Sequence, residues 1–69
     1  MIKELDVVIA TLDISSSIQK NTIGTVLSIS KDRKTYLVEF VDANKQTIGD
    51  GMTVVGQNQI KLFEEFKYK

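Results

Sequence analysis

Short apolar runs separated by polar segments make up most of the chain, and no segment repeats its apolar residues at helical spacing. The runs are rich in β-branched and aromatic residues, and several alternate between apolar and polar positions, which is typical of strands. In the clearest run, Tyr36, Val38 and Phe40 fall on one face, and Leu37 and Val41 fall on the other. We predict five strands, over residues 5–11, 22–30, 35–41, 46–55 and 60–63.

The segments between these runs carry the signals of turns and of one long loop. Residues 12–21 contain three consecutive serines, and we predict a surface loop from which Ile14 and Ile18 pack back onto the sheet. Polar turns follow the second and third runs and predict hairpins. In the second of these turns, Asn44 is the residue suited to a left-handed conformation.

Glycines within two of the runs predict local departures from regular strand geometry. Gly24 lies inside the second run, where it indicates a sharp bend or a close approach of another segment to the backbone. Gly49 and Gly51 flank Asp50 inside the fourth run, and they predict a bulge or a split strand.

Five short strands in a chain of 69 residues leave room for one domain only. A small closed barrel fits this length, since closure removes the exposed strand edges that promote aggregation. We therefore predict an all-β fold with a single small five-stranded barrel over residues 1–63, followed by a charged C-terminal tail over residues 64–69. Phe40 and Phe63 are predicted to lie in its core.

Composition narrows the function without specifying it. Nine basic and nine acidic residues give a formal net charge of zero, so there is no basic excess for binding phosphates, and we do not expect nucleic acid as a partner. The chain has no cysteine, which favours a cytoplasmic location over the disulfide-stapled secreted class. No run approaches the ~20 apolar residues of a membrane span, so no membrane association is expected.

The candidates for catalytic chemistry are weak. Without histidine, Ser15, Ser16 and Ser17 have no obvious activating base. The segment after Asp42 lacks the later glycine and glutamate of a calcium loop, and Gly49-Asp50-Gly51 is not followed by the residues of a phosphate-binding loop. We therefore predict that the chain is not an enzyme and has no catalytic residues, no metal site and no cofactor.

Several short motifs occur in an order and spacing that resemble a known family. They are Leu5-Asp6-Val7-Val8, Ile23-Gly24-Thr25-Val26, Tyr36-Leu37-Val38-Glu39-Phe40-Val41-Asp42, Gln46-Thr47-Ile48 and Gln59-Ile60. Over most of its length the chain resembles small bacterial proteins of the domain-of-unknown-function family DUF four-nine-two-six. The resemblance implies an SH3-like barrel, and it implies an immunity or antitoxin role, because some members look like neighbours of toxins.

The first functional hypothesis is a protein-binding module that neutralises a cognate toxin. Charged loops and exposed aromatic side chains would then contact the partner. The candidate contact residues are Asp13, Asp42, Asp50, Glu64, Glu65, Phe66 and Tyr68.

Two further hypotheses remain open. The segment Ile23-Gly24-Thr25-Val26, followed by Val38-Glu39-Phe40, also resembles a KOW-type barrel, which implies RNA or ribosome binding. The residues for that role are Lys31, Arg33, Lys34 and Tyr36, although the ring of Tyr36 fits a wall of the barrel better. The third hypothesis is a self-associating structural subunit, and we expect a monomer or a weak homo-oligomer.

Overall fold

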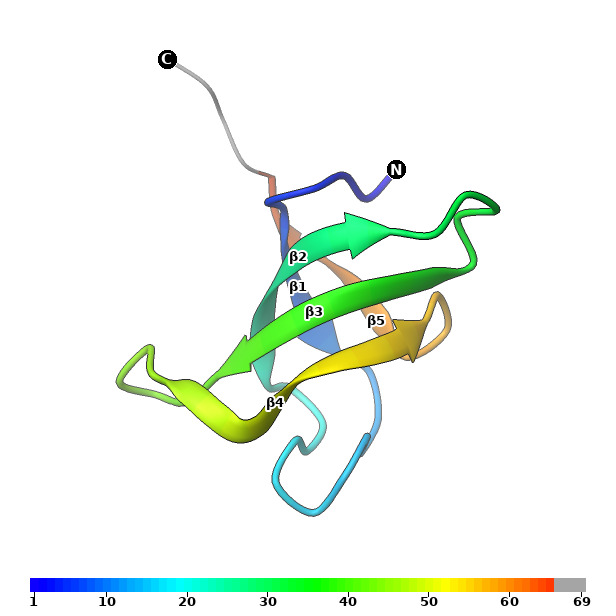
Figure 1. Cartoon of the computed structure of the whole chain (residues 1–69). Helices are drawn as coiled ribbons and strands as arrows, with labels where there is room; N and C mark the ends of the chain where they lie inside the picture. Colours follow the sequence, from blue (N-terminus) through cyan, green and yellow to red (C-terminus); the bar gives the residue numbers. More distant parts are fainter. Residues whose placement is uncertain (66–69) are drawn as a thin grey trace.

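The computed structural model describes residues 1–65 and contains five strands, which Figure 1 shows wrapped into one curved sheet. They are β1 (Val7–Ala10), β2 (Ile23–Ile29), β3 (Thr35–Val41), β4 (Thr47–Gly56) and β5 (Ile60–Glu64). Each predicted strand is present, and the described residues contain no helix. The first strand is shorter than predicted, and the last extends through Glu64, which we had assigned to the tail.

All strand pairs are antiparallel, and the sheet order is β4-β3-β2-β1-β5. Strands β1 to β4 therefore form a meander, and β5 returns to pair with β1 on its free side. The predicted all-β, five-stranded barrel is confirmed in class and strand number. The sheet is not closed, because β4 and β5 lie at its two edges.

The core is formed by one face of each strand, and it includes the residues predicted from the third run. Tyr36, Val38 and Phe40 are all buried. The long β1–β2 loop also contributes, since Ile18 is buried and Ile14 packs against the core, as predicted. The buried apolar residues are Val8, Ala10, Ile18, Val26, Tyr36, Val38, Phe40, Val55 and Ile60.

Gly24 of β2 pairs with Phe40 of β3, and its missing side chain makes room for two core residues. A Cβ atom built at this position would lie 2.6 Å from Val38 Cγ1 and 2.9 Å from Phe40 Cδ1. The predicted close approach at Gly24 is therefore confirmed.

Strand β4 contains the predicted bulge but is not split. Val41 pairs with Thr47 and Glu39 pairs with Met52, so the pairing register shifts between these two points. The extra residues of β4 bend it around the end of β3 (Figure 1). A Cβ at Gly51 would lie 2.6 Å from the carbonyl oxygen of Phe40, which explains why glycine occupies the bulge.

The β3–β4 turn differs from the prediction in one detail. Lys45, not Asn44, is the residue with a left-handed backbone, with φ of 63°. The Oδ1 atom of Asp42 accepts hydrogen bonds from the backbone N–H groups of Asn44 (2.8 Å) and Gln46 (3.0 Å). This Asx arrangement fixes the turn and moves the left-handed position one residue along the chain.

Within residues 1–65, no helix has the length and apolar character needed to cross a membrane.

Candidate protein-binding surface

Part of the outer face of the sheet is apolar, although Lys61, Thr25 and Glu39 lie on the same face. The pairing places Ile9, Ile23 and Val41 in line across β1, β2 and β3, on the side opposite the core. These side chains are only partly buried. An antiparallel sheet with one solvated face normally alternates apolar and polar residues, so an apolar outer face indicates a surface that another molecule can cover.

Phe63 on β5 belongs to this outer face, and the prediction that it lies in the core is wrong. Its side chain is 57% exposed. Because Ile60 points inward and alternate strand residues point to opposite faces, Lys61 and Phe63 both point outward. The same alternation was visible in the sequence, where Phe63 lies two residues after a lysine.

A shallow groove of about 480 Å³ lies next to Phe63 on the outer face. Its apolar part is contributed by four segments that are far apart in the sequence, and charged side chains lie among its lining residues. The apolar and neutral residues are Val7, Ile23, Thr25, Val41, Ala43 and Phe63, and the charged residues are Asp42, Lys45 and Glu64.

The predicted acidic contact residues do not form one patch. Of the five, the structure brings only Asp42 and Glu64 to the same groove. Asp13 lies in the β1–β2 loop, where its Oδ1 atom accepts a hydrogen bond from the Lys20 N–H at 2.8 Å. Asp50 lies at the β4 bulge and accepts a hydrogen bond from the Ser15 hydroxyl at 3.2 Å.

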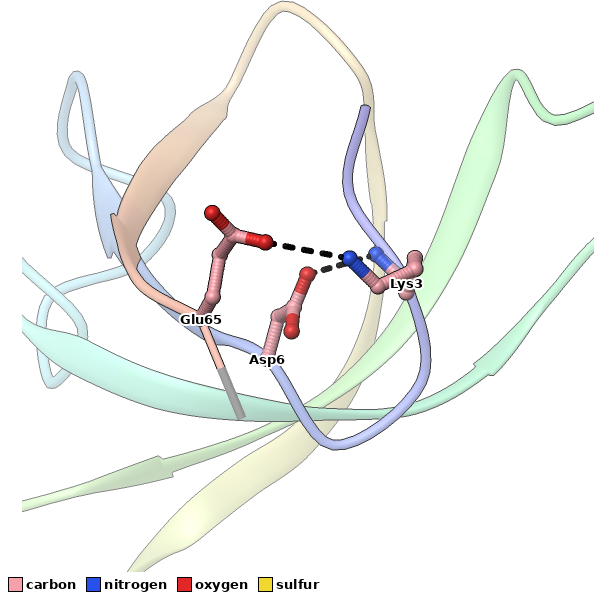
Figure 2. Close-up of polar contacts among 3 residues, drawn as sticks. All are labelled: Lys3, Asp6 and Glu65. Carbon is pink, nitrogen blue, oxygen red and sulfur yellow. Dashed lines mark hydrogen bonds and ion pairs between the residues drawn. The ribbon is translucent and has the colours of Figure 1, made fainter. Parts of the chain in front are cut away.

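Glu65 takes part in a contact between the two ends of the described chain, which Figure 2 shows. Lys3 Nζ lies 3.2 Å from Glu65 Oε2, and the Lys3 N–H donates to Asp6 Oδ2 at 2.8 Å. The carboxylate of Asp6 is fully buried, whereas the Lys3 and Glu65 side chains are more than half exposed. An exposed ion pair of this kind contributes about 0–1 kcal/mol. The contact of Glu65 with a partner stays a prediction.

The basic hairpin between β2 and β3 keeps its lysines and arginine at the surface, but Tyr36 does not join them. Lys31, Arg33 and Lys34 are exposed, while Tyr36 is only 7% exposed and forms part of the core. The position of Tyr36 in the barrel wall, which the sequence favoured, is therefore confirmed. Its ring does not stack on a base as the KOW-type hypothesis requires, since stacking needs an accessible ring face.

An acidic residue inside the same hairpin weakens its positive field. The Ser30 hydroxyl (2.6 Å) and the Lys34 N–H (3.0 Å) both donate to Asp32 Oδ1. These hydrogen bonds, that from Ser30 first, hold the pKa of Asp32 below its usual value and keep its negative charge. Lys31 and Arg33 share an open cleft of about 510 Å³ with Lys3, but Glu4 and Asp6 line it as well.

The family resemblance and two more of the predicted contact residues remain predictions. Comparison of the chain with protein-family models, with curated proteins and with solved structures finds no match. Membership of the family DUF four-nine-two-six is therefore an expectation from the motifs alone. Phe66 and Tyr68, predicted to contact a partner, lie outside the described residues.

Proposed function

We propose that the chain is a non-catalytic protein-binding module that buries its outer sheet face, centred on the groove beside Phe63, against a partner protein. The observation that supports this proposal is the half-exposed aromatic ring of Phe63 next to the apolar line of Ile9, Ile23 and Val41. Apolar centres ringed by polar residues are the usual anatomy of protein interfaces, and aromatic side chains are enriched at their hot spots.

The charges around the groove define the chemistry of the partner. Asp42 and Glu64 contribute one negative charge each and Lys45 one positive charge, which leaves one net negative charge (−1 −1 +1). A complementary surface presents an apolar side chain to the groove and a basic group next to it, because opposite charges favour the correct encounter.

The resemblance to the DUF four-nine-two-six family implies a toxin as this partner. We propose that the chain is an immunity or antitoxin protein that binds a toxin through the groove. A toxin with a basic surface, such as one that acts on nucleic acid, fits the acidic side of the groove.

Recovery of the partner from cells of the source organism tests this function. The baits are the wild-type chain, the variant Phe63→Ser, and the triple variant Lys31→Ser, Arg33→Ser, Lys34→Ser. We expect one stoichiometric protein that stays bound to wild type and to the triple variant at about 0.5 M salt, where exposed charge contacts are screened. Phe63→Ser is expected to lose it.

Other outcomes of the same experiment contradict the proposal. RNA or ribosomal proteins that wash off with salt and are lost from the triple variant indicate the KOW-type function. A protein retained equally by Phe63→Ser binds elsewhere on the chain. A second experiment tests the toxin assignment. Expression of the recovered protein alone is expected to arrest growth, and its co-expression with the wild-type chain is expected to restore growth.

A further inference from the structure

Strand β4 forms a free edge of the sheet, since it pairs with β3 on one side and with no other strand of the described chain. Two of its side chains, Met52 and Val54, are 58% and 64% exposed. Natural proteins usually protect such an edge with lysine, proline or a bulge. The bulge of β4 ends before Met52, and the segment from Met52 to Gly56 has no charged residue and no proline.

The direction of the backbone groups on this edge follows from the hydrogen bonds at the end of β4. The N–H of Gly56 donates to Gln59 Oε1 at 2.7 Å, and its carbonyl oxygen accepts the Gln59 N–H at 3.0 Å. The N–H of the next residue, Gln57, donates to the carbonyl oxygen of Lys34, which precedes β3. Gly56 therefore turns its backbone polar groups away from β3.

The direction of the backbone groups at Gly56 fixes that of the other residues of β4. Residues from Gly56 back to Met52 pair in regular register with β3, and successive residues of an antiparallel strand point their N–H and C=O groups to opposite sides. Like Gly56, Met52 and Val54 then point their backbone N–H and C=O groups toward the free edge.

We propose that this edge pairs with the same edge of a second copy of the chain, antiparallel and about a two-fold axis at Thr53. In this register Met52 lies opposite Val54 of the second copy, and Val54 lies opposite its Met52. Both residues then exchange N–H···O bonds with their counterparts through groups that point outward in each copy. The pairing leaves the contacts between Gly56 and Gln59 intact.

The chemistry of the segment favours a second copy as the occupant. On the outer face the apolar side chains of Met52 and Val54 meet each other. On the core side of the sheet, where Thr53 pairs with the buried Val38, Thr53 meets Thr53 of the second copy, a pairing that is favourable across strands. No like charges are opposed within the segment, and the net charge of the chain is zero, so two copies do not repel each other.

The size of the contact limits the affinity. A pairing confined to residues 52–56 buries less than the ~1,200 Å² of total surface that marks stable complexes. We therefore expect dissociation constants roughly in the high micromolar to millimolar range. This inference is independent of the groove beside Phe63, because neither Met52 nor Val54 lines that groove.

Sedimentation equilibrium and dilution of ¹⁵N-labelled protein test the pairing. We expect the weight-average mass to rise above 7.8 kDa as the concentration increases toward about 2 mM. The amide signals that shift most on dilution are expected to be those of Met52 and Val54. A mass that stays at the monomer value throughout overturns the proposal.

Three variants locate the contact. Val54→Lys adds a charge to the edge without changing the core, and we expect it to stay monomeric over the whole range. Val54→Pro removes only an outward-pointing N–H, and we expect it to fold and to stay monomeric as well. The matched control Phe63→Lys changes a residue of similar exposure on the opposite edge strand, and it is expected to associate like wild type.

The variants also separate this proposal from the proposed function. The β4 pairing is overturned if Val54→Lys associates at the same concentrations as wild type. It is also overturned if Phe63→Lys is the only variant that no longer associates. Neither result bears on partner binding through the groove, which Phe63→Ser tests.

Discussion

The substitution Gly24→Ala tests whether β2 and β3 approach as closely as the structure shows. The added methyl group would lie 2.6 Å from Val38 Cγ1, 2.9 Å from Phe40 Cδ1 and 3.0 Å from the carbonyl oxygen of Glu39. Favourable contacts between carbon atoms lie at about 3.5–4.0 Å. Since Val38 and Phe40 are both fully buried, neither side chain can move aside into solvent.

The magnitude follows from two opposing effects. Forcing a methyl group into a packed core costs about 1–3 kcal/mol. Replacing glycine by alanine also restricts the unfolded chain, which returns about 0.4–1 kcal/mol. We expect the free energy of unfolding to fall by roughly 1–2 kcal/mol, a large part of the ~3–5 kcal/mol available to a domain of this size.

Urea denaturation followed by circular dichroism measures this change, and Gly49→Ala is the matched control. A Cβ at Gly49 meets no atom within 4 Å, and no glycine of the described chain has a left-handed backbone. Gly49→Ala is therefore expected to be neutral or to stabilise by up to about 1 kcal/mol. Equal stability of the two variants would refute the packing argument at Gly24.

Three other changes test the core, a turn and a carboxylate. Phe40→Ala removes a fully buried ring and is expected to cost about 3–5 kcal/mol, so its far-UV spectrum at 25 °C should be that of a largely unfolded chain. Asp42→Ala removes the acceptor of two backbone N–H groups in the β3–β4 turn, and we expect it to lower the free energy of unfolding by about 1 kcal/mol. An unchanged urea midpoint would show that the turn forms without this carboxylate. Because the pKa of Asp32 is lowered in the folded chain, its contribution to stability is present above its unfolded pKa and is lost as the pH falls through the folded value. Ser30→Ala removes the first cause of this shift, so NMR titration should find a higher pKa for Asp32; an unchanged pKa contradicts the assigned cause.

Much of the fold was predictable because it depends on local pattern. Residues 35–41 are rich in aromatic and β-branched residues, and the predicted and observed strands coincide. The bulge and the close approach were signalled by Gly51 and Gly24, since both positions exclude a Cβ atom. Ile14 and Ile18 were identified as loop residues that return to the core because isolated isoleucines in a polar loop seldom stay in solvent.

The candidate site was harder to predict, because it depends on register between distant strands. Phe63 was assigned to the core by its residue type, whereas the inward position of Ile60 fixes it on the outer face. The groove joins Val7, Val41 and Phe63, which only the β1–β2–β3 and β1–β5 pairings bring together. The acidic residues were grouped by charge alone, and their local hydrogen bonds could not be read from the sequence.

The most direct test of the central claim is an NMR map of the partner's contact surface. The ¹⁵N-labelled chain is titrated with the protein recovered by wild-type bait, and the amide signals that shift or broaden are assigned. We predict the largest changes at Val7, Ile23, Val41 and Phe63, on the outer face. Changes confined to Lys31, Arg33 and Lys34, with the groove residues unaffected, would contradict the claim that this face is the binding surface.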